Sequence, residues 1–411
     1  METERQNPQW ENGFEYPYGK RRHIFESLRR SSKSGHITAV YGLRRVGKSV
    51  LMKQLINDAI KGGAERRSTF YFSFDEELPG FWDAVREFEK YQGRKVDGKS
   101  WLFFDEVQKV PDWRAKIKVL YDSTSARIFV SGSNSSGIRK GGESLAGRIN
   151  EFYLPELSFR EFLDFRGKCG SIDSGLERAL ELEFLDYAKR PFPETALKRG
   201  LEPKEYAGSI ARKIIFEDLP SVFPIDEPEL LNTLFQLICK SPGMQFDYGR
   251  MASDLGRNRK TISLYMDYLC YGFLARKLLN YSPNALSSEK KLKKFYPSLA
   301  AFCDCDQPRF IETAMAQCIK PGFFWRHKDR FEVDFVAKSP LAAFELKYRE
   351  SISASDWAGL RKFRDSFPQS SICMISKKPQ EKTVPYYMVE SHLEKRAPGC
   401  IARANRVKKK K

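Results

Sequence analysis

One short segment constrains the fold of this chain more than any other. Residues 42–49 read Gly-Leu-Arg-Arg-Val-Gly-Lys-Ser and stand between the apolar segment "GHITAVYG" and the helical pattern "KSVLMKQLINDAIKGG". A glycine loop between a strand and a helix turns backbone N–H groups towards a phosphate, and the helix dipole adds to the attraction. The segment therefore predicts an α/β domain that binds a nucleotide.

The residue types within this loop suit the chemistry of a bound triphosphate. Gly47 lets the phosphates approach the backbone, Lys48 reaches the β- and γ-phosphates, and the Ser49 hydroxyl ligates Mg²⁺. The predicted cofactors are thus ATP and Mg²⁺. The predicted nucleotide-binding residues in this segment are Gly42, Leu43, Arg44, Arg45, Val46, Gly47, Lys48, Ser49 and Val50. The alternative, a glycine turn that merely precedes a lysine, does not explain the strand–loop–helix order.

A second segment supplies the carboxylates that such a loop requires. "KSWLFFDEVQKVPDW" contains four apolar residues that end in Asp105-Glu106. An Asp at the carboxyl end of a buried strand lies beside Mg²⁺, and a following Glu polarises the attacking water. We therefore expect Asp105 to be a metal ligand and Glu106 the catalytic base. The pair favours hydrolysis over transfer to a second substrate, so a kinase is disfavoured; an acidic strand end facing solvent is the other alternative.

Two later segments extend the same site. "ARIFVSGSNSSG" predicts a strand whose tip carries Ser133 and Asn134, either of which contacts the γ-phosphate or orients the water. Arg148, in "SLAGR", is a candidate arginine finger that completes the site of a neighbouring copy, and a surface charge is its alternative. Together with the strand predicted in "STFYFSFDEE", these segments favour a parallel sheet covered by helices on both faces.

Several of these segments resemble one family in their order and spacing. "YGLRRVGKS", "LFFDEVQKVPDW", "VSGSNSS", "SLAGR" and "YLPELSFREFL" are similar to segments of prokaryotic AAA-type P-loop ATPases, a mostly uncharacterised archaeal and bacterial family. The resemblance covers essentially the whole chain and is most specific over residues 36–165. It implies an ATPase of the ASCE type, with Glu106 as catalytic base and Ser133 or Asn134 as sensor. It also implies a winged helix and a C-terminal domain of unknown function with nuclease-like residues.

The middle of the chain is predicted to be helical. Residues 166–225 are charged and interrupted by prolines, which is typical of a lid or connector. "MASDLG" then predicts a short helix, and "RKTISLYMDYLCYGFL" a longer one, with Arg257, Arg259, Lys260 and Thr261 at the start of this recognition helix. "LARKLLNY" predicts the first strand of a wing. This is a helix-turn-helix pattern, which either binds DNA or serves as a rigid connector.

A hairpin near the C-terminus collects carboxylates. In "RFEVDFVAKSPLAAFELKYRE", a loop centred on Ser339-Pro340 places Asp334 opposite Glu345 and Glu332 opposite Lys347, all on one face. The other face, from Phe331 to Tyr348, is apolar. A primed two-residue turn suits Ser-Pro badly, so we expect a four-residue loop.

Facing carboxylates destabilise a sheet unless a cation lies between them, and Mg²⁺ prefers such ligands. Asp334, followed after ten residues by Glu345-x-Lys347, resembles the PD-(D/E)XK nuclease core. We expect Asp334 and Glu345 to bind metal and Lys347 to orient or activate a water. Glu312, in a preceding helix, is a candidate to join them, whereas His327 is expected to be an ordinary loop histidine. A surface hairpin with exposed charges is the alternative.

Composition limits the partners of the chain. Its 411 residues carry a formal net charge of +18, which favours polyanions such as DNA. No apolar run reaches the ~18 residues of a membrane-spanning helix, and the polar N-terminus predicts no secretory signal. The eight cysteines lack a disulfide framework, and Cys303, Cys305 and Cys318 fit no common zinc spacing. We expect a cytoplasmic protein, and the candidate finger Arg148 would require a homo-oligomer.

These observations predict a fold class and its boundaries. It is α/β, with a P-loop NTPase domain over 1–165, a helical connector over 166–225 and a winged helix over 226–297. A nuclease-like α/β domain follows over 298–395, and a basic tail over 396–411. The leading hypothesis is an ATPase coupled to DNA binding or processing through a Mg²⁺-dependent nuclease-like domain. The alternative is an ATP-dependent regulatory switch or scaffold whose nuclease-like domain is catalytically silent.

Overall fold

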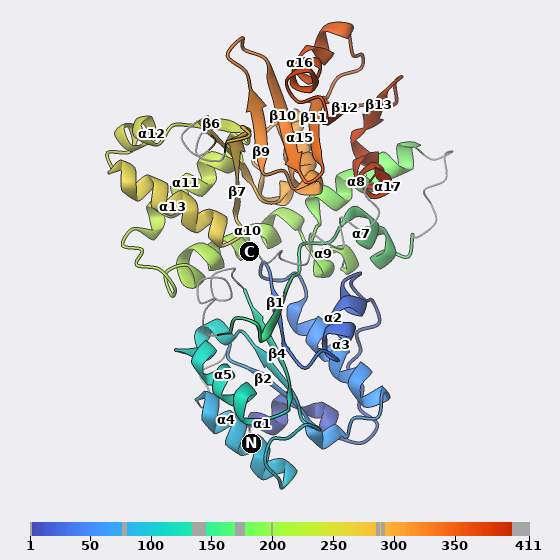
Figure 1. Cartoon of the computed structure of the whole chain (residues 1–411), viewed down its shortest axis with the longest axis vertical. Coiled ribbons are helices and arrows are strands. Elements are labelled where there is room, and N and C mark those ends of the chain that lie inside the picture. The colour runs from blue at the N-terminus through green and yellow to red at the C-terminus, as the bar shows by residue number, and fades with distance from the viewer. Residues whose placement is uncertain are drawn as a thin grey trace. The chain divides into compact units, whose positions relative to one another are not determined.

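The chain forms two compact units (Figure 1). The computed structural model describes residues 2–75, 80–133, 145–168, 177–198, 200–284, 288 and 292–396. The first unit ends at Leu157 and the second begins at Ser158. No helix within the described ranges is long and apolar enough to cross a membrane.

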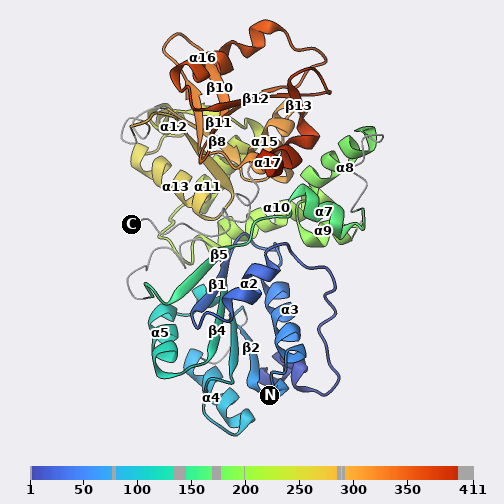
Figure 2. The same ribbon diagram turned by 45° about the vertical axis from the view of Figure 1, so that its right-hand side comes forward.

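The first unit is built on a parallel sheet. In chain order its elements are α1 (Glu2–Gln6), η1 (Pro8–Trp10), α2 (Phe25–Ser31), β1 (Ile37–Tyr41), α3 (Lys48–Lys61), η2 (Arg66–Ser68), β2 (Thr69–Ser73), α4 (Phe81–Gln92), β3 (Trp101–Asp105), η3 (Val107–Lys109), α5 (Trp113–Ser123), β4 (Arg127–Gly132) and β5 (Ile149–Tyr153). The described strands pair in parallel in the order β2-β3-β4-β1-β5. Helices α2 and α3 lie on one side of the sheet, and α4 and α5 on the other (Figures 1 and 2). The predicted parallel sheet with helices on both faces is confirmed.

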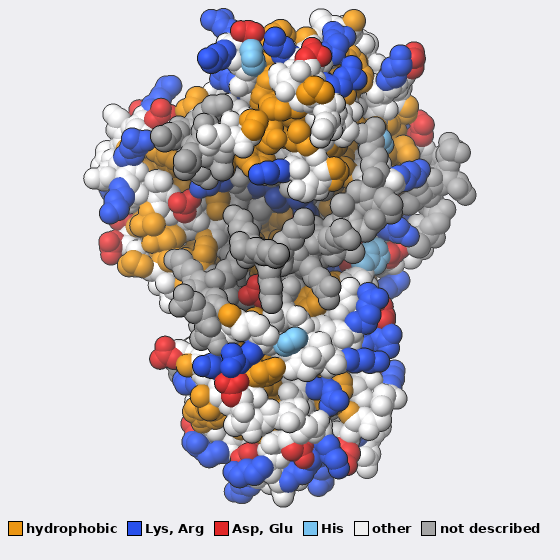
Figure 3. All heavy atoms as spheres, viewed as in Figure 1, with side chains coloured by type: hydrophobic (Ala, Val, Ile, Leu, Met, Phe, Trp, Pro, Cys, Tyr) orange, Lys and Arg blue, Asp and Glu red, His pale blue; other side chains and the backbone are white. Residues whose placement is uncertain are grey.

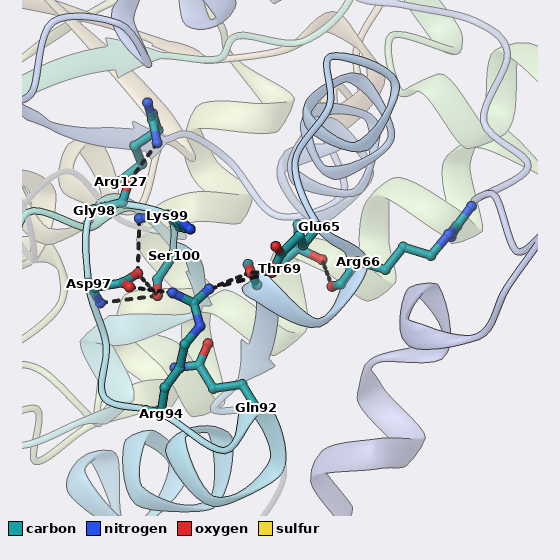
Figure 4. A network of polar contacts seen from close by, with 11 residues as sticks. Glu65, Arg66, Thr69, Gln92, Arg94, Asp97, Gly98, Lys99, Ser100 and Arg127 are labelled. Atoms are coloured by element: carbon teal, nitrogen blue, oxygen red, sulfur yellow. Dashed lines mark hydrogen bonds and ion pairs between the residues drawn. The ribbon is translucent and has the colours of Figure 1, made fainter.

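The amino ends of three of these strands are tied together by polar contacts (Figure 4). Arg94 follows α4 and donates to Asp97 and, at 2.6 Å, to the Ser68 hydroxyl just before β2. Arg127, the first residue of β4, donates at 3.0 Å to the Gly98 carbonyl just before β3. These contacts hold the strand ends that lie away from the loop 42–49, so the carboxyl ends are left for a site.

The second unit combines a helical part with a larger sheet. Its elements are α7 (Phe159–Phe165), α8 (Glu177–Lys189), α9 (Pro193–Leu197), α10 (Pro203–Lys213), the π-helix η4 (Ile214–Asp218), α11 (Pro228–Lys240), β6 (Met244–Phe246), α12 (Tyr248–Asp254), α13 (Arg259–Tyr271), β7 (Ala275–Asn280), β8 (Lys293–Pro297), η5 (Ala300–Phe302), α15 (Gln307–Ile319), β9 (Phe323–Arg326), β10 (Glu332–Lys338), β11 (Leu341–Lys347), η6 (Ala354–Trp357), α16 (Ala358–Ser366), β12 (Ser371–Ser376), β13 (Thr383–Pro385), η7 (Tyr386–Met388) and α17 (Val389–Arg396). The helices predicted around residues 251–256 and 259–274, and the strand that follows them, are present as α12, α13 and β7.

One sheet runs through the second unit. Its described strands follow the order β13-β12-β11-β10-β9-β7-β8-β6. Strand β7 pairs with β8 in antiparallel fashion and with β9 in parallel, so two groups of strands are joined edge to edge. The sheet therefore continues across the predicted boundary at 297/298. The helix α7, which falls within the predicted range 1–165, belongs to the second unit.

The hairpin of β10 and β11 has the predicted register. Phe335 pairs with Phe344 and Lys338 with Leu341, so the loop is centred on Ser339-Pro340. The expected four-residue loop is wrong, however. The strands are joined by Ser339 and Pro340 alone, whose peptide bond is cis, a form that occurs in tight turns.

The expected alternation of faces fails in one place. A bulge between Val333 and Val336 interrupts the pairing of β10 with β9. Because the bulge shifts the alternation, Val333 and Val336 pack in the same hydrophobic cluster, whereas Phe335 contacts the ring of Tyr296. The apolar residues around the bulge are thus divided between two cores.

Candidate functional site

The loop 42–49 joins the end of β1 to the start of α3, as predicted. Gly42 is close to the chain that follows β5, because a Cβ on Gly42 would lie 2.1 Å from the Leu154 carbonyl oxygen. Gly47 has φ of +97°, a left-handed conformation that favours glycine. Both glycines of the pattern are therefore required by the backbone. Leu43 and Val46 are buried and anchor the loop.

Lys48 lies back across its own loop. The side chain is buried, and its Nζ donates to the carbonyls of Gly42 at 3.1 Å and Leu43 at 3.0 Å. The ammonium group is also close enough to Glu106 to lower the pKa of that carboxyl. The structure thus brings the predicted phosphate-binding lysine and the predicted base to one place.

Asp105 ends β3 with its side chain buried. It accepts hydrogen bonds from the Tyr71 hydroxyl at 2.7 Å, from the Ser131 hydroxyl and from the backbone N–H of Glu106 at 3.1 Å. The Ser49 side chain lies close enough to the same Tyr71 to act on its pKa. The two predicted metal ligands, Ser49 and Asp105, therefore share a neighbour. Burial, and next the charge of Asp105, raise the pKa of Tyr71, so its hydroxyl stays a donor.

Glu106 is held by a polar cage. Its carboxylate accepts from the Ser133 hydroxyl at 2.7 and 2.8 Å and from the Gln108 side chain. Burial alone would raise the pKa of Glu106, but Lys48, Gln108 and Ser133 together lower it below its usual value. The carboxylate is therefore ionised at neutral pH, as a base that receives a proton must be.

The order of the strands explains why these residues meet. Strand β4 lies between β1 and β3, and all three are parallel. Their carboxyl ends therefore share one edge, where Ser133 follows β4 between the loop after β1 and the acidic pair at β3. Ser133 lies where the sensor was predicted, and Asn134 falls outside the described residues. Arg44 is near enough to Glu106 to lower its pKa.

Arg148 lies at the other end of the sheet. Its backbone carbonyl accepts a hydrogen bond from the N–H of Ile37, the first residue of β1. The phosphate loop instead follows Tyr41, the last residue of β1. Its half-exposed side chain pairs with Asp122 at 2.9 Å. Arg148 therefore does not belong to the site of its own chain, and its action on a neighbouring copy stays a prediction.

Sequence reasoning missed three residues of this site. Tyr71 stands in an apolar strand pattern and was assigned no function, and Gln108 was not singled out. Arg22 is buried and donates to the carbonyls of Val46 at 2.8 Å and Pro155 at 2.9 Å. It fixes the loop to the segment after β5. None of the three has a local pattern that predicts its distant partner.

A second cluster of carboxylates surrounds the β10–β11 hairpin. Glu345 is buried and accepts from Lys347 Nζ at 2.6 Å and from the backbone N–H of Asp334 at 3.3 Å. Asp334 accepts from the N–H of Leu346 at 2.9 Å. The predicted residues Asp334, Glu345 and Lys347 are thus brought together, and Glu312 on α15 is near enough to Asp334 for their charges to interact.

The positive charges near these carboxyl groups do not offset the effects that raise their pKa values. Burial, and then the charge of Asp334, raise the pKa of Glu345 to about 8 and that of Glu312 to about 7. Burial also raises the pKa of Asp334. Carboxylate oxygens are the donors that Mg²⁺ prefers, so the chemistry of this set fits the ion. Within the described ranges, no three His, Cys, Asp or Glu side chains are already placed around a metal position, so binding would require the side chains to turn.

Other predicted candidates have ordinary surroundings. His327 contacts Asp329 at 3.1 Å in the loop between β9 and β10. Cys303 and Cys305 are free thiols that lie close to each other. Arg257, before α13, pairs with Glu227 at 2.6 Å, whereas Arg259 and Lys260 are exposed in the first turn of that helix. Figure 3 shows Lys and Arg side chains interspersed with Asp and Glu on the face in view.

Comparison with known proteins separates the chain into three matched regions. Residues 34–163 match an AAA domain. Residues 191–298 and 311–388 match two domains of unknown function, DUF8612 and DUF4143. The first match supports an AAA-type P-loop ATPase family for the N-terminal region, and with it nucleotide binding of the ATPase type. The other two matches assign no activity.

Similar whole proteins are themselves uncharacterized. The chain is 23% identical to an uncharacterized protein of Haemophilus influenzae over 288 residues, which is 67% of this chain and 70% of that protein. It is 27% and 26% identical to two uncharacterized proteins of Methanocaldococcus jannaschii, over 60% and 62% of this chain. These matches cover 57% and 58% of the two archaeal proteins, less than two thirds of their length.

Proposed function

We propose that this chain hydrolyses ATP at the site around the loop 42–49 and uses it in DNA binding or processing. The observation that carries the hydrolysis is the ionised Glu106 carboxylate, which the Ser133 hydroxyl holds near Lys48. A base and a phosphate-binding cation at one sheet edge suit attack by water on a γ-phosphate.

The residues of the chain divide the reaction among them. Ser49 and Asp105 would hold Mg²⁺, which supplies charge neutralisation at the phosphates. Lys48 exchanges the carbonyls of Gly42 and Leu43 for phosphate oxygens. Glu106 accepts the proton of the attacking water, and the bond between the γ-phosphorus and the leaving ADP oxygen breaks. Ser133 keeps the Glu106 carboxylate in position.

ATP hydrolysis is tested with the full chain and matched variants. Glu106→Gln should bind an ATP analogue but lose turnover by about 10²- to 10⁴-fold, the usual contribution of a general base. Lys48→Ala should lose binding as well. Glu26→Gln, in an exposed ion pair on α2, is the control and should keep full activity. If Glu106→Gln hydrolyses ATP as fast as the wild type, Glu106 is not the general base.

A second activity is part of the proposal, because Asp334, Glu345 and Lys347 meet in the second unit. There α15 is followed by the antiparallel strands β9, β10 and β11, then α16, then β12 parallel to β11. This helix–strand–strand–strand–helix–strand order supports a PD-(D/E)XK-like fold. Asp334 and Glu345 would hold Mg²⁺, and Lys347 would orient the water that attacks a phosphodiester.

The cleavage is tested on linear, circular and single-stranded DNA with Mg²⁺ or Mn²⁺, with and without ATP. Asp334→Ala should abolish it, and Asp365→Ala, an exposed carboxylate on α16, should not. Loss in Lys48→Ala would show that ATP drives the cleavage. If the wild type hydrolyses ATP but cuts no substrate, the alternative of an ATP-dependent switch or scaffold with a silent second unit is favoured.

DNA binding belongs to the proposal through α11, α12, α13 and the strands β6, β7 and β8. Three helices followed by an antiparallel hairpin support a winged helix, in which α13 would carry Arg259 and Lys260 to phosphates. Arg259→Ala with Lys260→Ala should weaken DNA binding and lessen its dependence on salt. Arg257→Ala is the control, because Glu227 already pairs with that arginine. If Arg257→Ala loses as much DNA affinity as the Arg259→Ala/Lys260→Ala variant, α13 does not bind DNA through Arg259 and Lys260.

Two further predictions complete the proposal. Cys239, Cys270, Cys303 and Cys305 are free thiols, which supports a reducing compartment such as the cytoplasm.

A homo-oligomer is proposed because Arg148 lies away from the site of its own chain. Arg148→Ala protein mixed with Lys48→Ala protein should recover turnover only if the arginine acts on a neighbour.

A further inference from the structure

Strand β8 carries two polar residues into the interior of the second unit. Lys294 and Tyr296 are two positions apart, so they lie on one face of the strand. Both are buried, with 6% and 0% of their surface exposed. A buried lysine and a buried tyrosine hydroxyl require partners.

The partner of Tyr296 is a carboxylate of the cluster at the hairpin. The Tyr296 hydroxyl donates to Glu312 Oε1 at 2.6 Å. Gly243, just before β6, leaves room for this contact, because a Cβ there would lie 2.7 Å from the hydroxyl and 3.0 Å from Glu312 Oε1. Two segments of the wing-like hairpin region thus shape the surroundings of one carboxylate on α15.

The partner of Lys294 is Glu332 at the start of β10, with which its Nζ forms an ion pair. The charges of Asp334 and Glu312 also act on Lys294. Burial alone would lower the pKa of Lys294, but Asp334 and Glu332 raise it, so the group is an ammonium ion. Arg326 also lies 3.9 Å from Glu332, so with every group ionised four carboxylates face three basic side chains and the cluster keeps a negative charge. A cluster of carboxylate oxygens with a net negative charge suits a divalent cation.

The sheet explains how β8 reaches this cluster. It pairs with β7, and β7 pairs with β9 through Leu279 with Phe323 and Asn280 with Phe324. The strands of the proposed winged helix and of the proposed nuclease-like fold therefore belong to one layer. Lys294 comes from a different matched region than Asp334 and Glu345.

We propose that β8 is part of the carboxylate site: Tyr296 positions Glu312 as a ligand, and Lys294 holds Glu332 and limits the negative charge offered to a divalent cation. This inference rests on the proposed metal site of the second unit. It makes that site dependent on both matched regions. Tyr296 and Lys294 are positioning residues and do not themselves touch the cation.

The test measures the affinity of the full chain for Mn²⁺, without nucleotide or DNA, by electron paramagnetic resonance. Tyr296→Phe keeps the ring and removes the hydroxyl, and should weaken binding about tenfold or more, as loss of a partner that orients a ligand does. Lys294→Met removes a cation near the metal and should tighten binding about threefold or more. Lys293→Met is the matched control, since Lys293 precedes Lys294 on β8 and points to the opposite face of the strand, over the Tyr248 ring.

The outcomes separate this inference from the proposed function. Opposite shifts in Tyr296→Phe and Lys294→Met, with Lys293→Met unchanged, support it. If Glu345→Gln abolishes binding but Tyr296→Phe behaves like Lys293→Met, β8 is not part of the site. If Glu345→Gln binds Mn²⁺ as the wild type does, the proposed metal site itself fails. Should Lys294→Met not fold, the conservative Tyr296→Phe variant still decides between these results.

Discussion

At the scale of single residues, Glu106 combines an unusual backbone with a well-held side chain. Its φ is +54°, and a non-glycine residue in this left-handed region costs about 1 kcal/mol or more. Its neighbour Asp105 accepts the Glu106 N–H at 3.1 Å, and Ser133 holds the carboxylate. The surrounding contacts thus compensate for strain at the residue that would activate the water.

The raised pKa of Glu345 predicts that the stability of the protein depends on pH. Its pKa is raised to about 8, first by burial and then by Asp334, so the folded protein favours the protonated form. The stabilisation is complete below the usual pKa near 4.5 and is lost as pH rises through about 8. The free energy of unfolding, from denaturant titrations in a chelator, should fall between about pH 4.5 and 8. In Glu345→Gln the fall should be smaller by more than about 1.4 kcal/mol, the equivalent of one pKa unit. If the unfolding free energies of the wild type and of Glu345→Gln fall equally with pH, Glu345 is not the cause of the pH dependence.

At the scale of elements, the phosphate loop depends on the segment that follows β5. The Leu154 N–H donates to the Tyr41 carbonyl at 2.8 Å, so this segment runs beside the end of β1. Arg22 holds the same two pieces of chain together. The conformation of residues 42–49 is therefore set by contacts that are distant in the sequence.

Gly42→Ala tests this packing. The added methyl would clash with the Leu154 carbonyl oxygen, and overpacking of this kind costs about 1–3 kcal/mol. We expect a lower melting temperature and weaker binding of an ATP analogue, measured by calorimetry. Gly19→Ala is the control, since a Cβ there meets nothing within 4 Å. Equal behaviour of the two variants would argue against a tight contact.

Helix α7 depends on a carboxylate from α17. Glu390 is buried and accepts from the backbone N–H groups of Phe159 at 2.8 Å and Arg160 at 3.0 Å. Glu390→Ala should lower the free energy of unfolding by about 1–3 kcal/mol, because two donors at the helix start lose their acceptor. Glu394→Ala, which breaks only the ion pair with Arg160, should cost less than about 1 kcal/mol. A similar cost for both would place the stabilisation elsewhere.

Local patterns in the sequence predict some parts of this molecule and not others. Lys48, Asp105, Glu106 and Ser133 each lie at or after the end of a strand in a contiguous motif, and the carboxyl ends of parallel strands share one edge of the sheet. The register of the β10–β11 hairpin also follows from counting, because the partners are local. The contacts of Tyr71 and Lys294 depend on strand partners far along the chain, which a pattern of apolar residues does not specify. The two-residue loop was not predicted for another reason: most two-residue hairpin loops are primed turns, which Ser-Pro suits badly.

At the scale of the whole molecule, the two candidate sites lie in different units. Asp334→Ala should leave affinity for an ATP analogue unchanged, and Lys48→Ala should leave affinity for Mn²⁺ unchanged, since each site is built from residues of its own unit and substitutions without shared partners add independently. Calorimetry on the two variants and their combination measures this. A change of more than about threefold in the opposite site would instead show that the two ligands are coupled.

The pairing of β7 with β9 has a consequence for how this protein is divided in the laboratory. The matched regions end at residue 298 and resume at 311, which suggests two pieces that fold separately. Dividing the chain there would break the pairing of β7 with β9 and leave two exposed edge strands. Exposed edge strands promote aggregation between chains. Each half, expressed alone, would also bury carboxylates or a lysine without their counter-charges. The second unit should therefore be produced, crystallised and exchanged between relatives as a single piece.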